Sequence, residues 1–150
     1  GPFIQLLSCL GGESLHSCSS EVRRFRPGLD YTLAHVGTQC QVDTLDATLT
    51  FVSSRPEHAE LWDSGDVGGF ECHVQASNDH GAAEVYRADE SSAGVTSIHA
   101  QANTLSLVRR RTDTMKFIKY LGAAAPGSRW DVAAEYACAV QAQPQAARSE

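Results

Sequence analysis

Short apolar runs separated by turn residues are the feature that most constrains how this chain can fold. Beyond the N-terminal segment, β-branched and aromatic side chains recur in brief stretches, and glycine, proline, asparagine or aspartate stands between them. These stretches do not alternate with long helical patterns, so their spacing favours an antiparallel sandwich or jelly roll over a parallel α/β sheet. We therefore predict a mainly β fold with a short N-terminal helix.

The apolar pattern places each expected element along the chain. Residues 2–10 carry apolar side chains at helical spacing, with Pro2 in the first turn and Gly11-Gly12 as the end signal. In the run 68–76, apolar and polar residues alternate, as in a strand with one apolar face. The expected strands are residues 20–25, 30–36, 45–52, 68–76, 83–87, 95–100, 104–110, 115–121 and 129–140.

Length and composition suit a single domain. The chain has 150 residues with an apolar share of 42%, enough for one core without disulfides or a metal. We expect residues 1–140 to form this domain and residues 141–150 to be a disordered tail. The acidic stretch 55–67 is expected to be a surface loop or a short helical excursion. Gly1-Pro2 is not a natural start, so we interpret it either as a protease scar or as a cut inside a longer protein.

Charge and cysteine content narrow the environment and the partners. The formal net charge is −6, which argues against direct nucleic-acid binding. The basic group Arg109-Arg110-Arg111, with Lys116 and Lys119 after it, is interpreted as a solvated strand end and turn. Five cysteines without a Cys-x-x-Cys pair indicate thiols in a reducing compartment, so we expect a cytoplasmic or nuclear protein. No stretch has the length of a membrane span.

His35 is the first candidate for a metal site, because it ends an expected strand after the turn Pro27-Gly28. A non-haem iron site needs two histidines and a carboxylate, and in jelly-roll oxygenases the first pair is His-x-Asp. Here Gly37 stands at the carboxylate position. Arg129 resembles the arginine that clamps the cosubstrate's carboxylate, but the segment 115–121 before it lacks the second histidine. We therefore predict no catalytic, metal or cofactor-binding residue, with His35 and Arg129 as possible remnants of such positions.

The remaining histidines do not rebuild a site. They are scattered and are interpreted as ordinary surface residues; they are His16, His58, His73, His80 and His99. Cys72 and His73 are adjacent on one expected strand, so their side chains should point to opposite faces and make poor co-ligands. A carbohydrate-binding module would display an aromatic side chain near acidic groups, and Trp62 beside Asp63 is the candidate for that role.

Several segments read in order carry a family resemblance. They are VRRFRPGLDYTLAH, DATLTFV, GDVGGFECHV, NTLSLVRRRTDTMKFIKYL and APGSRWDVAAEY. Across roughly residues 3–138, this order resembles the C-terminal, non-catalytic domain of the ribosomal-protein prolyl hydroxylase family of 2-oxoglutarate- and iron-dependent oxygenases. The resemblance implies a double-stranded β-helix that has lost its metal ligands, and a separate N-terminal domain that carries out the hydroxylation.

The resemblance also implies cofactors and partners. The parent family uses Fe(II), 2-oxoglutarate and ascorbate, and this domain is expected to use none of them. Its expected partners are the N-terminal catalytic domain of the same protein and a ribosomal, translation or transcription-factor protein. The expected role is that of an interaction or regulatory module. Candidate docking residues, each of which also suits core packing, are Phe3, Leu7, Trp62 and Phe70.

Two other functions stay open at this point. One is a free-standing oxygenase with an unusual ligand set, and the other is a generic jelly-roll binding module. The contacts of Arg129 help to distinguish an inactive domain from these alternatives. In an inactive domain, Arg129 should make a structural contact, either with a carboxylate such as Asp131 or Glu135 or with the carbonyl groups of a neighbouring strand.

Overall fold

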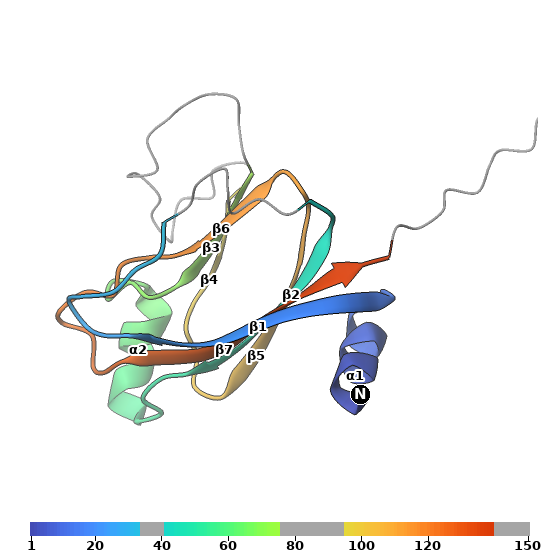
Figure 1. Cartoon of the computed structure of the whole chain (residues 1–150). Coiled ribbons are helices and arrows are strands. Elements are labelled where there is room, and N and C mark those ends of the chain that lie inside the picture. Colours follow the sequence, from blue (N-terminus) through green and yellow to red (C-terminus); the bar gives the residue numbers. More distant parts are fainter. Residues whose placement is uncertain (34–40, 76–94, 140–150) are drawn as a thin grey trace, which may run out of the picture.

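The computed structural model describes residues 1–33, 41–75 and 95–139, shown as coloured ribbon in Figure 1. The helices and strands of these ranges are α1 Pro2–Gly11, β1 Leu15–Phe25, β2 Thr44–Phe51, α2 Pro56–Ser64, β3 Glu71–Gln75, β4 Val95–Ile98, β5 Thr104–Arg110, β6 Thr114–Ile118 and β7 Arg129–Cys138. Within the described ranges, neither helix is long and apolar enough to cross a lipid bilayer.

The strands form two antiparallel sheets. The larger sheet has the order β1-β7-β2-β5, and the smaller one has the order β4-β3-β6. Strand β7, the last in sequence, lies between β1 and β2, so the two ends of the described chain meet in the larger sheet. The expected mainly β fold with a short N-terminal helix is confirmed, and the curled antiparallel sheets are compatible with a double-stranded β-helix.

Most expected elements are found close to their expected positions. The strand expected at 104–110 has these bounds, and the strand expected at 20–25 begins earlier, at Leu15. Residues 30–33 are not in a strand, which contradicts the first half of the run expected at 30–36. The rest of that run, the strand expected at 83–87 and the tail 141–150 lie outside the described residues.

Helix α1 covers part of the outer face of the larger sheet. Pro2 stands in its first turn, and Gly12 ends it in the left-handed conformation with φ 66° while donating its N–H to the carbonyl of Ser8. Leu7 is fully buried and packs with Ala47 and Ala134 of the sheet. This contact, rather than helix propensity, is what holds so short a helix in place.

For the acidic stretch 55–67, the sequence leaves open a surface loop or a short helix. In the structure, residues 56–64 are helical and form α2. Its Trp62 is 2% exposed and packs in one cluster with Phe25, Ile118 and Leu121. These residues come from the ends of β1 and β6 and from the segment that follows β6, so α2 lies over one end of the sheets (Figure 1).

The space between the two sheets is polar, and this determines where a site can lie. On β2, Asp46 and Thr48 are buried on the inner face, whereas Ala47 packs under α1 on the outer face. The smaller sheet meets them with Glu71 and His73, which are 2% and 4% exposed. The alternation in the run 68–76 is therefore real, but from Gly68 to Val74 both of its faces are buried.

The basic group near the end of β5 is likewise not a solvated patch. Arg110 is 2% exposed, and the Lys116 side chain is 9% exposed, because both point into the space between the sheets. Arg109 and Arg111 keep the expected exposed positions. The interpretation as a solvated strand end is wrong for Arg110 and Lys116, since inward and outward positions alternate along a strand.

Candidate functional site

Asp131 lies at the centre of the first charged cluster between the sheets. Its buried carboxylate accepts hydrogen bonds from Arg23 Nε at 2.7 Å and Arg23 Nη2 at 3.1 Å. Arg129 approaches the same carboxylate through Nε at 3.2 Å and Nη2 at 3.0 Å. Two guanidinium groups therefore share one carboxylate, and Arg129 also donates to the carbonyl of Gly69 across the gap between the sheets.

Asp46 is the centre of the second cluster. Arg110 Nε donates to Asp46 Oδ2 at 2.7 Å, and Lys116 Nζ lies 3.1 Å from the same oxygen. Glu135 completes the group, with Oε1 at 2.9 Å from Arg110 Nη2 and 3.1 Å from Lys116 Nζ. Burial lowers the pKa of Lys116, but the charges of Asp46, Glu71 and Glu135 outweigh it, so the pKa of this ammonium group is raised.

Glu71 and His73 form the third group, on β3. Glu71 Oε1 lies 2.8 Å from His73 Nε2, and Glu71 Oε2 accepts a hydrogen bond from Thr48 across the gap at 3.2 Å. Burial raises the pKa of Glu71, but the hydrogen bond with His73 and the charge of Lys116 outweigh it and lower the pKa from 4.5 to about 2. Glu71 is therefore ionised at neutral pH.

Arg129 makes a structural contact of the kind that the sequence predicts. It is 1% exposed and makes its structural contact with Asp131, while the carbonyl of Gly69 supplies the second contact. Glu135, the other carboxylate considered, pairs instead with Arg110 and Lys116. His35, the possible remnant of a metal position, and Gly37 lie outside the described residues.

The inner face does not fit a divalent iron ion. The oxygens of Asp46 and Asp131 already face arginine and lysine side chains, and Glu71 faces His73 with Arg129 nearby at 3.9 Å. A dication placed there would be repelled by these cations and would have to displace them from their carboxylates. The described residues contain no group of three or more metal-ligating side chains close enough to hold a metal ion.

Two expectations about aromatic and histidine side chains are wrong. His73 is buried rather than a surface residue, because β3 has no solvent-facing side at this position. Trp62 is buried in the core, so it cannot serve as the exposed aromatic of a carbohydrate site. Cys72 packs with Phe70 and Val74 while His73 faces Glu71, so the two adjacent side chains do point to opposite faces.

The other histidines differ in their contacts. His16 is exposed, His58 pairs with the Ser53 hydroxyl at 2.7 Å, and His99 contacts the carbonyl of Asp63. His80 lies outside the described residues. The described histidines therefore differ in burial and in partners. Among them, His73 is the one whose side chain lies beside the charged clusters between the sheets.

Sequence reasoning missed the charged clusters as a group. A signal was present on β2, where Thr44, Asp46, Thr48 and Thr50 alternate with apolar residues. Such alternation is normally assigned to one buried and one solvated face. Only the pairing of β2 with β5 and β7, and the position of the smaller sheet opposite, shows that the polar face is the inner one.

A pH dependence of stability follows from Glu71. Because its pKa falls from 4.5 in the unfolded chain to about 2 in the folded one, its contribution is present above pH 4.5 and is lost as the pH falls toward 2. We expect the contribution to be on the order of 3 kcal/mol. The measurement is the free energy of unfolding in urea against pH, for the wild type and for Glu71→Gln.

The difference between these two proteins should be largest above pH 4.5 and should shrink below it. Glu57→Gln is the matched control, because Glu57 is exposed in the first turn of α2. A difference between wild type and Glu71→Gln that stays constant through this range would contradict the assignment.

Comparison with known proteins identifies the family. Residues 1–144 match the family model described as oxoglutarate and iron-dependent oxygenase degradation C-term. Over 117 residues, 78% of this chain, the sequence is 44% identical to a protein of Ostreococcus tauri named Prolyl 3,4-dihydroxylase OGFOD1. The matched region spans 22% of the length of that relative. The chain therefore belongs to the C-terminal domain family of the oxoglutarate- and iron-dependent oxygenases.

Proposed function

We propose that this chain is a non-catalytic docking and regulatory domain of a 2-oxoglutarate- and iron-dependent prolyl hydroxylase. Its partner is the catalytic domain of the same protein, whose substrate we take to be a small-subunit ribosomal protein. The family match and the relative's name support the parent activity. The observation that carries the docking role is an apolar sheet face that α1 leaves uncovered.

This uncovered sheet face consists of Val22, Phe51, Trp130 and Val132, which are 72%, 40%, 45% and 38% exposed. The four residues lie together because Val22 pairs with Val132 across β1 and β7, and Trp130 pairs with Phe51 across β7 and β2. The same face is covered by Leu7 of α1 further along the strands, at Ala47 and Ala134. Sheet faces of this kind are normally covered, so the surface suits a protein partner.

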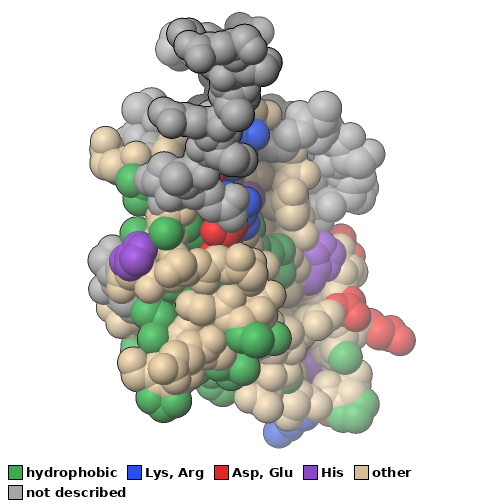
Figure 2. Space-filling view, turned by 90° about the vertical axis from the view of Figure 1, so that its right-hand side faces the viewer, with side chains coloured by type: hydrophobic (Ala, Val, Ile, Leu, Met, Phe, Trp, Pro, Cys, Tyr) green, Lys and Arg blue, Asp and Glu red, His purple; other side chains and the backbone are tan. Residues whose placement is uncertain are grey.

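Helix α1 carries further exposed apolar side chains. Phe3, Leu6 and Leu10 are at least half exposed, although Leu7 of the same helix is buried. On the side of the molecule that carries α1, hydrophobic side chains reach the surface (Figure 2). Among the docking candidates from the sequence, only Phe3 is exposed, because Leu7, Trp62 and Phe70 are in the core.

The catalytic domain is the occupant we favour because most of the relative lies outside the matched region. With 22% of its length matched, the relative has ample chain for a second domain held close to this one. A covalent link raises the effective concentration of a neighbouring domain, so a modest apolar face suffices for stable docking. The charged interior also supports a non-catalytic role, because the donors of Arg129 are already engaged by Asp131 and by the carbonyl of Gly69.

The docking role predicts that Trp130→Ser combined with Val132→Ser weakens binding to the separately produced catalytic domain by about tenfold or more, because both side chains lie at the middle of the uncovered sheet face. Binding is measured by isothermal titration calorimetry. Leu61→Ser is the control, since Leu61 is 41% exposed but belongs to α2 and not to the larger sheet.

Equal binding of the double variant and the control would contradict the docking role. A succinate-release assay on the chain alone separates the main alternative. Turnover of 2-oxoglutarate without the catalytic domain would instead favour a free-standing oxygenase with an unusual ligand set.

A further inference from the structure

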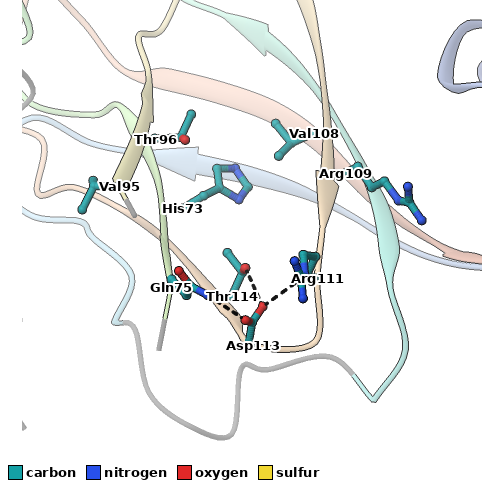
Figure 3. A pocket seen from close by; sticks show the side chains of 9 residues that line it. All are labelled: His73, Gln75, Val95, Thr96, Val108, Arg109, Arg111, Asp113 and Thr114. Carbon is teal, nitrogen blue, oxygen red and sulfur yellow. Dashed lines mark hydrogen bonds and ion pairs between the residues drawn. The ribbon is translucent and has the colours of Figure 1, made fainter. Parts of the chain in front are cut away.

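Two pockets of the domain differ in how their polar side chains are paired. In the pocket between the sheets, of about 290 Å³, Asp113 accepts from Gln75 at 2.9 Å and from Thr114 at 3.4 Å, and Arg111 lies 3.8 Å from it (Figure 3). These side chains satisfy one another. A second pocket, of about 220 Å³, is different, because Trp62 in its wall carries a buried donor without a partner.

This second pocket, the Trp62 pocket, lies where α2 meets the ends of the sheets. Its wall consists of residues 52–54 after β2, of Ala59, Trp62 and Asp63 on α2, and of residues 100–102 between β4 and β5. The volume is below the usual range for sites that hold a drug-sized molecule, so the pocket suits one small chemical group.

Trp62 determines what kind of group the pocket needs. The residue is 2% exposed, and its Nε1 is buried without a hydrogen-bond partner, although buried indole N–H groups usually find one. Cζ3, at the opposite end of the ring, would lie 3.5 Å from a Cβ added at Gly69. Nε1 therefore points away from Gly69, on the side of the pocket. Because an indole nitrogen only donates, the missing partner is an acceptor.

The charge of the wall decides between a charged and an uncharged acceptor. Asp63 lines the pocket, and its Oδ1 accepts from Gln101 Nε2 at 3.3 Å. A ligand carboxylate would be repelled by this aspartate, whereas a carbonyl oxygen would not. The carboxylate of Asp63 also has lone pairs for a further donor, so an N–H group on the ligand would be favourable.

The apolar part of the wall favours a methyl group beside the carbonyl. Val52, Ala59, Ala100 and Ala102 line the pocket, and their small side chains suit contact with another methyl group. An acetamide combines such a methyl group with a carbonyl and an N–H. Since Nε1 is itself buried, binding requires a wall side chain to turn aside, and Gln101 is exposed and flexible enough to do so.

We propose that the Trp62 pocket binds an uncharged acetamide group, whose carbonyl oxygen accepts from Trp62 Nε1 and whose N–H donates to Asp63. The group belongs either to a free small amide or to an acetylated lysine of a peptide, since both present the same atoms. The site does not include the uncovered sheet face, so this proposal and the docking role can each fail without the other.

The test uses the whole chain and reads both tryptophans. Indole N–H signals are followed by NMR while N-methylacetamide is added, and sodium acetate is the charged comparison at constant ionic strength. We expect N-methylacetamide to shift the Trp62 signal in a saturable way and to leave the signal of Trp130, on the uncovered sheet face, in place. Acetate should bind about tenfold more weakly or less, because Asp63 repels it.

A variant that fills the pocket separates specific binding from a solvent effect. Ala59→Leu should weaken the binding of N-methylacetamide by about tenfold or more, because the added carbons take the space of the ligand's methyl group. Ala59 is exposed on α2, so the core is left intact. Ala124→Leu is the matched control, since Ala124 is exposed and does not line the pocket.

Three results would each overturn the proposal. They are a Trp62 signal that N-methylacetamide does not shift at high concentration, equal affinities for acetate and N-methylacetamide, and equal affinities of Ala59→Leu and Ala124→Leu for N-methylacetamide.

Two peptides distinguish the sources of the group. One carries an acetylated lysine between two arginines and the other is the same peptide without the acetyl group; arginines are chosen because Glu57, Glu60 and Asp66 are exposed near the pocket. Tighter binding of the acetylated peptide than of the other peptide and of N-methylacetamide would assign the site to an acetylated side chain. Similar binding of the acetylated peptide and N-methylacetamide would assign it to a free small amide.

Discussion

Replacing Asp131 with asparagine is expected to lower the free energy of unfolding by about 3–5 kcal/mol. The Asp131 side chain is fully buried and serves Arg23 and Arg129 at once. Asparagine has nearly the same shape but no charge, so two guanidinium groups would lose their shared counter-charge, and Arg129 is itself only 1% exposed. Burial already lowers the pKa of Arg129, in spite of Asp131 and Glu71. The measurement is urea unfolding at neutral pH.

Glu21→Gln is the matched control for this prediction. It makes the same change of charge beside the same arginine, with Glu21 Oε1 at 3.4 Å from Arg23 Nη1, but the Glu21 side chain is 65% exposed. Water replaces a lost exposed partner, so we expect a change within about 1 kcal/mol. If the two variants lost the same free energy, the buried cluster could not be the cause of the effect.

The second large effect is expected at Gly68, where alanine should cost more than about 4 kcal/mol or prevent folding. An added Cβ would lie 1.9 Å from the backbone carbonyl oxygen of Tyr120, and φ at this position is 72°. The contact is close because Gly68 pairs with Leu121, and neighbouring bonds tie the segment before β3 to the segment after β6. Thermal unfolding followed by circular dichroism measures the loss.

Gly12→Ala separates the steric clash from backbone strain. Gly12 has nearly the same φ, 66°, but an added Cβ would meet nothing within 4 Å. Only the left-handed conformation then opposes alanine, at a cost of about 1–2 kcal/mol. Comparable losses for the two variants would show that backbone strain alone explains Gly68, and that the approach of Tyr120 is not essential.

These effects bear on what the charged interior does for the domain. The described inner face carries its own carboxylates on its own arginines and lysine. Arg129 illustrates this, since its donors are engaged by Asp131 and Gly69. The charged interior thus serves the stability of the domain, and the proposed docking role rests on the sheet face that α1 leaves uncovered.

Local patterns were sufficient for much of the fold. The strand at 104–110 and the helix at the N-terminus were predictable, because period-2 alternation, Pro2 and the Gly11-Gly12 signal act within a few residues. The helix at 56–64 was less certain, since an acidic segment with one buried residue, Trp62, has almost no apolar periodicity. Its position depends on the cluster with Phe25 and Leu121, which are distant in sequence.

The site was less predictable than the fold. The absence of a carboxylate two residues after His35 is a property of the sequence, and so is the contact expected between Arg129 and a nearby carboxylate. The burial of His73, Arg110 and Lys116 is not, because a polar residue on an alternating strand normally faces water. Whether such a residue faces water here depends on which side chains of the opposite sheet lie against it.

The sequence by itself therefore determined the β class of this domain, its family and a structural contact for Arg129, whose partner the structure identifies as Asp131. The tertiary structure alone decided which face of each sheet is inside. Alternation divides the residues of a strand into two sets, but it does not say which set meets the other sheet. Here the polar sets meet, as in the contact of Thr48 with Glu71, and the part of the apolar set that carries Trp130 is left uncovered.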